Sequence, residues 1–174
     1  MAGKCLIIID MQNDFITGSL GTAEAVKIVP KAVEKAENFK GDIIFTKDTH
    51  FENYLSTAEG RLLPVKHCIK GTEGHELAPE LDKICKERNC RIFEKNTFGS
   101  VALAEELARK NSENPFEEIQ LIGLCTDICV ISNALLLKAF MPEVKISVDK
   151  SCCAGVTPEK HEAALAVMES CQIL

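Results

Sequence analysis

The stretch KCLIIID, residues 4–10, decides the fold, because it is a short continuous apolar run that ends on an acid. Similar runs follow at intervals along the chain: DIIFTKD (42–48), CRIFEK (90–95), EEIQLIG (117–123) and VKISVD (144–149). Continuous apolar runs of this length are typical of strands that are covered on both faces, and such strands build a parallel sheet.

Helical patterns separate these strands, over residues 22–39, 75–88, 100–110, 126–140 and 157–170. Pro30 predicts a kink or a restart in the first of them. Strict alternation of strand and helix needs right-handed crossover connections. The sequence therefore predicts one α/β domain over residues 1–174, with a doubly wound central parallel sheet and helices on both faces. QIL (172–174) could add a short sixth strand.

Composition limits the partners and the compartment. Of 174 residues, 46% are apolar and 26% charged, and the net charge of −6 argues against nucleic acid or an anionic membrane as the main partner. No apolar run is long enough to cross a bilayer, and the N-terminus lacks the order of a signal peptide. Nine cysteines in a chain with a sizeable core favour free thiols in a reducing cytoplasm, most of them packed in the interior.

Polar residues follow the predicted strands at the end where α/β proteins bind ligands. Asp10, Asp48 and Lys95 end the first three strands, and GLCTDICV (123–130) follows the fourth. The carboxyl ends of parallel strands lie at one edge of a sheet, so we expect these groups to gather there.

Cys129 is the candidate nucleophile within that group. It falls in the first turn of a predicted helix, where the dipole and free N–H groups stabilise a thiolate. Asp10 could accept the thiol proton, Lys95 could stabilise either anion, and N–H groups around Cys125 and Cys129 could hold an oxyanion. The spacing alone leaves a second interpretation open, in which Cys129 only packs in the core, Asp10 caps a helix and Lys95 is a solvated surface group.

A second group suits a divalent metal. Asp48 and His50 form an Asp-x-His at a strand end, and Glu59 and His67 follow in the irregular stretch 49–74. Long irregular loops in compact domains tend to be functional. Two His and two carboxylates can hold Zn, Mn or Fe, although Asp-x-His also occurs by chance.

Other reaction classes lack their motifs. The sequence has no GxGxxG after the first strand, no GxxxxGK[ST] and no GxSxG. CTDIC places three residues between its cysteines, so it is neither a thioredoxin-type CxxC nor a convincing zinc hook.

The chain resembles the isochorismatase-like cysteine hydrolases, and within them the nicotinamidase-like amidases. The resemblance rests on IIIDMQNDF (7–15), TKDTH (46–50), LPVKHCIKGTEGHEL (63–77), EKNTFGS (94–100) and GLCTDICV, and it covers nearly the whole chain. It implies a triad of Asp10, Lys95 and Cys129. It also implies a cis peptide bond at Leu124–Cys125, with the N–H groups of Cys125 and Cys129 as the oxyanion hole.

The resemblance further implies a metal site and a substrate pocket. The ligands carry over as Asp48, His50 and His67, with Glu59 at a fourth position that varies; zinc is favoured, with Mn or Fe as alternatives. The pocket residues are expected to be Phe15, Tyr54, Leu63 and Leu124. Many nicotinamidases have an aromatic residue where this chain has Leu63, which weakens the case for nicotinamide. A homo-oligomer is also implied.

Together these features predict a metal-assisted cysteine amidase that converts a small amide, foremost nicotinamide, to nicotinate and ammonia. Alternatives are a hydrolase of another small C–N substrate, such as a carbamoyl or ureido compound, and a non-catalytic binding protein on the same fold. Cys129 argues against the isochorismatase branch proper, which lacks this cysteine.

Overall fold

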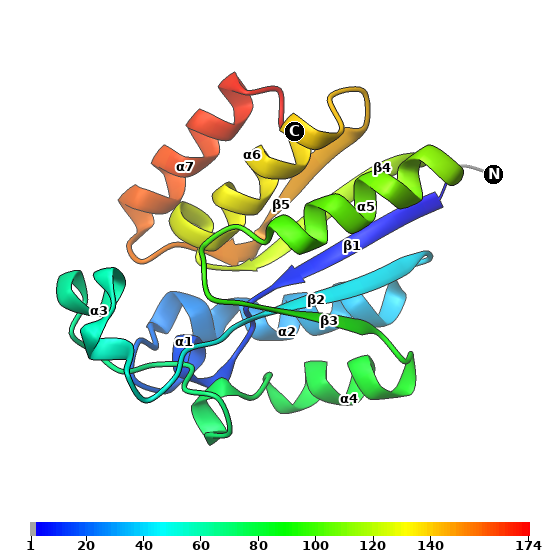
Figure 1. Cartoon of the computed structure of the whole chain (residues 1–174). Coiled ribbons are helices and arrows are strands. Elements are labelled where there is room, and N and C mark those ends of the chain that lie inside the picture. Colours follow the sequence, from blue (N-terminus) through cyan, green and yellow to red (C-terminus); the bar gives the residue numbers. More distant parts are fainter. Residues whose placement is uncertain (1–2) are drawn as a thin grey trace.

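The computed structural model describes residues 3–174 and is built around a five-stranded parallel sheet in the order β3-β2-β1-β4-β5 (Figure 1). The strands are β1 (Gly3–Ile9), β2 (Asp42–Asp48), β3 (Arg91–Lys95), β4 (Phe116–Leu124) and β5 (Lys145–Ala154). The predicted α/β parallel sheet is confirmed, and each predicted run forms a strand.

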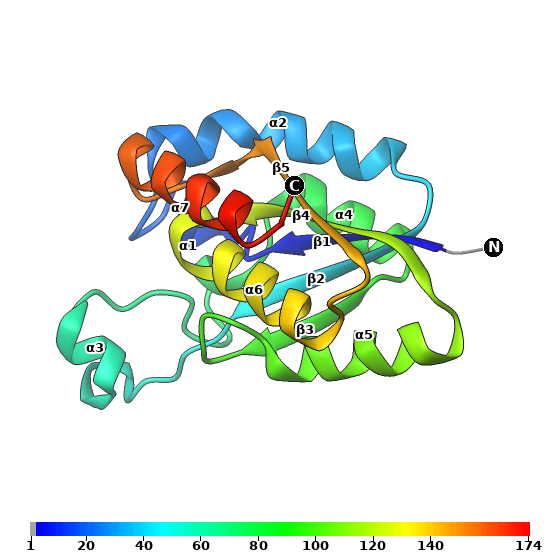
Figure 2. The same cartoon turned by 90° about the horizontal axis from the view of Figure 1, so that it is seen from above.

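Helices cover both faces of the sheet (Figure 2). On one face lie α2 (Ala23–Asn38) and α4 (Pro79–Glu87); on the other lie α5 (Val101–Glu113), α6 (Ile131–Phe140) and α7 (Pro158–Ser170). Shorter elements are α1 (Asn13–Ile16), α3 (Ala58–Leu62), the 3₁₀ turns Tyr54–Ser56 and Glu73–His75, and a π-helical turn (Thr126–Val130). Within residues 3–174, none of the helices has the length and apolar character needed to span a bilayer.

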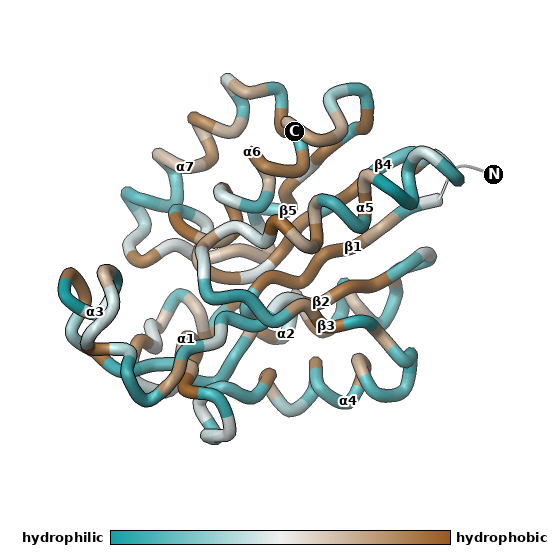
Figure 3. The backbone as a smooth tube through the Cα atoms, viewed as in Figure 1, coloured by the Kyte–Doolittle hydropathy of each residue, from teal (hydrophilic) through white to brown (hydrophobic). Residues whose placement is uncertain are grey.

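The core follows directly from the apolar runs. Leu6, Ile7, Ile8 and Ile9 of the central strand β1 are fully buried, because helices pack against both of its faces. Figure 3 shows the hydrophobic residues concentrated along the strands and the hydrophilic ones on the outer helix faces. Two-sided burial explains why β1 reads as a continuous apolar run and not as an alternating one.

The sixth strand and the restart at Pro30 are not found, whereas the alternative of a kink at Pro30 stays a prediction. QIL forms no strand: the Ile173 N–H still bonds to Met168 O at the end of α7 (2.9 Å), so only Leu174 reaches the edge of β5, where it bonds to Ile146 and Val148. The first helix does not restart at Pro30, because α2 is one helix from Ala23 to Asn38. Pro30 is exposed, so water can satisfy the carbonyl that lacks its N–H.

The sheet order places a crevice where the connections diverge. From β1 the chain moves to β2 on one side, whereas β4, which follows β3, pairs on the other side of β1. The carboxyl ends of β1 and β4 therefore flank a topological switch point, the usual ligand site of open α/β sheets. The segment that contains α3 projects beyond the same ends of the strands (Figures 1 and 2).

Gln12, fully buried just after β1, ties this region together. Its Oε1 accepts the N–H of Asp48 (2.7 Å), and its Nε2 donates to Asp48 O and to His75 O (2.9 Å each). One side chain thus fixes the end of β2 and the loop before α4 to the end of β1.

We predict that Gln12→Ala lowers the free energy of unfolding by about 3 kcal/mol, since three hydrogen bonds of about 1 kcal/mol each are lost and their backbone partners stay buried. Urea denaturation followed by circular dichroism measures the change. The control is Asn38→Ala, which removes one exposed bond to Glu34 O and should cost less than about 0.5 kcal/mol. Equal effects of the two variants would contradict the prediction.

Candidate active site

Asp10 lies directly after β1, fully buried, with a φ of 45°. This left-handed conformation is uncommon for a residue other than glycine and persists only where the surroundings hold it. Here Thr46 on β2 holds it twice: the hydroxyl donates to Asp10 Oδ1 (2.6 Å) and accepts the Asp10 N–H (3.2 Å). The carboxylate therefore has one fixed orientation, with Oδ2 directed away from Thr46.

Lys95, at the end of β3, joins the other charged groups. Its Nζ lies 2.6 Å from Asp10 Oδ2 and 3.7 Å from Asp48 Oδ1, and it donates to Cys129 Sγ at 3.5 Å. The Lys95 side chain is 2% exposed, so water hardly screens these contacts. The structure thus brings together Asp10, Lys95 and Cys129, as the sequence predicted.

Cys129 lies in the π-helical turn that follows β4. The turn is closed by the Val130 N–H, which bonds to Cys125 O (3.0 Å), five residues back. The peptide bond Leu124–Cys125 is cis, as the resemblance implied. Asp127 Oδ1 accepts the Val156 N–H (2.9 Å), which ties the turn to the start of the last helix. Single π turns occur frequently at functional sites.

Burial and the neighbouring charges together set the protonation states of the three groups. Burial raises the pKa of the Asp10 carboxyl, with the charge of Lys95 opposing the rise. Burial, and next the charge of Asp10, raise the pKa of the Cys129 thiol well above its usual value. Burial lowers the pKa of Lys95, but the nearby Asp10 and Cys129 outweigh it and raise that pKa. The resting site is therefore a neutral thiol beside an ammonium and a carboxylate that is more basic than usual.

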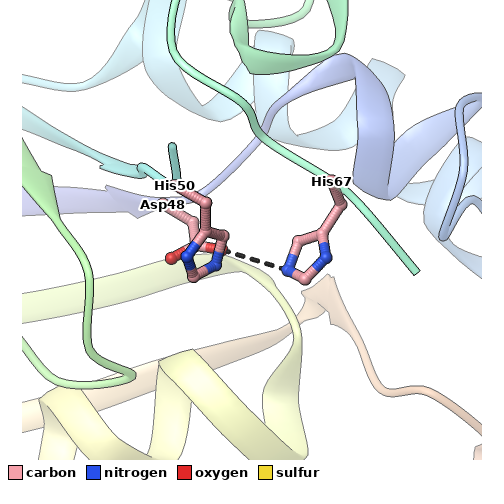
Figure 4. A group of neighbouring side chains, drawn as sticks. All are labelled: Asp48, His50 and His67. Atoms are coloured by element: carbon pink, nitrogen blue, oxygen red, sulfur yellow. Dashed lines mark ion pairs between the residues drawn. The ribbon is translucent and has the colours of Figure 1, made fainter. Parts of the chain in front are cut away.

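The predicted metal ligands also converge (Figure 4). One ligand atom from each of Asp48, His50 and His67 lies within 4.8 Å of the others, and all three residues are buried. Asp48 Oδ2 is 3.0 Å from His50 Nε2 and 3.4 Å from His67 Nε2. Glu59 Oε1, from α3, lies 3.6 Å from both Nε2 atoms. The structure thus brings Asp48, His50 and His67 into one cluster, with Glu59 beside the two imidazoles.

The chemistry of this cluster fits a divalent cation. Although His50 Nε2 is close to Asp48, it has no aligned hydrogen-bond partner among residues 3–174, so a buried polar atom is left free. The other nitrogen of His67 bonds to Val65 O (2.8 Å), which directs His67 Nε2 toward the cluster. Burial works against it, but contacts with His50 and His67 hold the pKa of Asp48 below its usual range, so it is a ready anionic ligand.

A cavity of about 640 Å³ lies beside Cys129 and the candidate metal ligands Asp48, His50, His67 and Glu59, here called the metal-ligand cluster. Apolar side chains make up most of its lining: Phe15, Leu62, Leu63, Phe98, Ile128 and Val156. A more open groove of about 740 Å³, lined by Lys31, Lys35 and Asp149, contains none of the strand-end residues. The first cavity is therefore the candidate active site.

The predicted pocket residues divide into two pairs. Phe15 and Leu63 line the cavity, and the Phe15 ring lies 5.5 Å from that of His67. Tyr54 and Leu124 are buried outside the lining. The Tyr54 ring packs behind His50 (4.6 Å) and its hydroxyl donates to Leu63 O, so it supports the ligands.

Sequence reasoning missed other residues of the cavity wall. Asn96, Thr97 and Phe98 line it directly after Lys95, and their place at a strand end was the available signal. Val156, just before α7, and Lys160, in the first turn of α7, also line it. Nothing in the local pattern of these two indicated that they lie near Cys129.

Known proteins resemble this chain over nearly its whole length. Residues 4–173 match the Isochorismatase domain family. A Bacillus subtilis (strain 168) protein named "uncharacterized isochorismatase family protein PncA" is 35% identical, covering 94% of this chain and 92% of its own length. The structure of nicotinamidase PncA from Bacillus subtilis has a TM-score of 0.80 at 32% identity, covering 96% of this chain and 94% of that one. Pyrazinamidase of Pyrococcus horikoshii in complex with zinc has a TM-score of 0.77 at 29% identity, covering 98% and 97%.

We predict that the purified chain binds about one zinc ion, and that His50→Ala or His67→Ala reduces the bound zinc at least tenfold, because each removes a nitrogen ligand. Zinc is measured by plasma mass spectrometry after dialysis against a weak chelator. The matched control is His75→Ala: His75 is equally buried but bonds to Thr49 Oγ1 at 2.9 Å, outside the cluster. Full zinc content in folded His50→Ala protein would contradict this site.

Proposed function

The chain belongs to the isochorismatase family, and we propose that it is a metal-assisted cysteine amidase that hydrolyses nicotinamide, or a close pyridine carboxamide, to the carboxylate and ammonia. The observation that carries the proposal is the position of Lys95 Nζ, which contacts both Asp10 Oδ2 and the Sγ of Cys129, a residue that lines the cavity. The nicotinamidase and pyrazinamidase names of the similar structures support the same reaction class.

Asp10 and Cys129 begin the reaction. Asp10 Oδ1 already accepts the Thr46 hydroxyl, so Oδ2, which lies 2.6 Å from Lys95 Nζ, is the oxygen that takes the thiol proton. The sulfur then attacks the amide carbon, and the carbonyl oxygen becomes an oxyanion. The backbone N–H groups of Cys125 and Cys129 hold this charge. Lys95 keeps the Asp10 carboxylate and the sulfur in place.

Asp10 completes both halves of the reaction. When the C–N bond breaks, the protonated Asp10 gives its proton to the leaving nitrogen, so ammonia departs and a thioester remains on Cys129. Asp10, again a carboxylate, takes a proton from water, and the water oxygen attacks the thioester carbon. The C–S bond breaks, the sulfur recovers the proton from Asp10, and the carboxylic acid is released.

Asp48, His50 and His67 are the residues that would hold the metal, with Glu59 as a fourth ligand. Zinc is favoured, since two imidazoles and carboxylates suit it, and Mn or Fe remains an alternative. A divalent ion at this cluster supplies a Lewis acid toward water or toward a pyridine nitrogen. His67 lines the cavity itself, so the cluster borders the space that substrate occupies.

The cavity walls suit a small planar amide. Phe15 provides one aromatic wall beside His67, whereas Leu63 stands where a stacking ring would lie in many relatives. An aromatic contact contributes about 0.5–1.5 kcal/mol beyond burial, so its loss weakens binding about tenfold at most.

We extend the proposal to the organisation of the protein. Residues 1–174 act as one domain that works in a reducing cytoplasm, for which its nine free cysteines are suited. The family resemblance supports a homo-oligomer, and the net charge of −6 disfavours nucleic acid as a partner.

Cys129→Ala should abolish ammonia release, because the attacking sulfur is lost, while Cys125→Ala should keep at least about a tenth of wild-type kcat, because Cys125 acts through its backbone N–H. Circular dichroism checks that both variants fold. An alkylating reagent should modify Cys129, and added substrate should protect Cys129 from it. Peptide mass spectrometry identifies the modified cysteine. A label found chiefly on Cys125 would show that Cys129 is not the nucleophile.

The substrate is tested by kcat/KM for nicotinamide, benzamide and a set of ureido compounds, with ammonia release as the readout. Nicotinamide should exceed benzamide by at least about tenfold, since only nicotinamide has a ring nitrogen that can reach the metal-ligand cluster. If a ureido compound exceeds nicotinamide by several orders of magnitude, the pyridine substrate is refuted and the cysteine mechanism survives.

A further inference from the structure

Lys95 and Cys129 meet although the sheet does not hold their strands together. Lys95 ends β3, at one edge of the sheet, and Cys129 follows β4, with β2 and β1 between them. The hydrogen-bond ladder of β3 runs to β2 alone. The 3.5 Å contact between Lys95 Nζ and Cys129 Sγ therefore depends on what joins the two segments beyond the sheet.

A single side chain on α6 makes that connection. Asn133, which is 1% exposed, accepts the N–H of Ser100 with Oδ1 (2.9 Å). Its Nδ2 donates to Phe98 O (3.1 Å) and also to Cys129 O (2.8 Å). The Asn133 amide thus bonds at once to the segment that follows Lys95 and to the nucleophile residue itself.

Close packing at Gly99 supports the same contact. A Cβ atom on Gly99 would lie 3.3 Å from Ser132 O, so the backbone of this segment lies against α6 with little space between them. Within the segment, Thr97 Oγ1 donates to Gly99 O (2.7 Å), which folds the chain back on itself. The link from Lys95 to Ser100 is therefore short and compact, and a displacement at Ser100 is passed to Lys95.

We propose that Asn133 is a positioning residue of the amidase reaction, which holds the Lys95 segment and the Cys129 turn at the separation that the reaction needs. The inference rests on the proposed function. Asn133 does not line the cavity, whereas Cys129 and Phe98 do, and Asn133 acts through the backbone carbonyls of these two residues. Its amide is suited to the task because it offers an acceptor and two donors, and all three bonds run to backbone groups.

The first test is Asn133→Ala with nicotinamide as substrate. We expect kcat to fall about ten- to a hundredfold, since small misplacements of reacting groups have effects of this size, while KM changes less than about threefold. The matched control is Asn111→Ala: Asn111 Oδ1 likewise accepts a backbone N–H, that of Phe116 (2.9 Å), but at the opposite end of β4. The control should lower the melting temperature and leave kcat unchanged.

The second test needs no substrate. The rate at which iodoacetamide alkylates Cys129, followed by peptide mass spectrometry, should fall at least about fivefold in Asn133→Ala and stay unchanged in Asn111→Ala, because Lys95 no longer lies beside the sulfur. Unchanged kcat and alkylation with a lowered melting temperature, or a loss confined to KM, would overturn the positioning role. A wild-type chain that releases no ammonia would refute the amidase function, and the alkylation rates would still decide the role of Asn133.

Discussion

Two opposite charges, on Asp10 and Lys95, lie 2.6 Å apart with almost no contact with water. Removing both ions from water costs several kcal/mol each, and only good geometry offsets that cost. The surroundings are arranged accordingly: Thr46 bonds to the second carboxylate oxygen, and Lys95 also faces Asp48 and Cys129. Loss of either partner would leave an uncompensated buried charge, which costs about 3–5 kcal/mol. The pair thus constrains the positions of β1, β2 and β3 at their carboxyl ends.

Asp48 couples this pair to the metal-ligand cluster. Its Oδ1 lies 3.7 Å from Lys95 Nζ, while its Oδ2 faces His50 and His67. Only the Asp48 carboxylate would therefore separate a cation at the cluster from Lys95, which contacts the proposed nucleophile Cys129. Charge at either place changes the electrostatic potential at the other, because little water separates them.

The parts of the site that follow strand ends could be predicted from the sequence. Asp10, Asp48 and Lys95 end apolar runs, and the carboxyl ends of parallel strands must share an edge. Asn133, Thr46 and Gln12 could not be predicted, because each lies within or beside a pattern that explains it locally. Apart from the bond of Asn133 to Cys129, their partners lie 33 to 63 residues away. The family resemblance supplied the cis peptide at Leu124–Cys125, which spacing alone could not, whereas Glu59 was already a candidate ligand on its residue type and its place in the irregular stretch. The order of the strands depends on which distant segments pair, and the hydrophobic pattern within one segment does not show this. The approach of α7 to Cys129 follows from that order and could not be predicted either.

The π-helical turn at 126–130 contains one residue more than an α-helical turn would, because the Val130 N–H bonds to Cys125 O, five residues back. Each residue of an α-helix advances the side chains by about 100° around the axis. Loss of one residue anywhere in the turn would let it relax to ordinary helical pairing and rotate the thiol away from Lys95, although the composition would hardly change. The position of the sulfur therefore depends more on the number of residues in this turn than on the identity of most of them. Deletion of a single residue from this turn would therefore separate the sulfur from Lys95 in one step.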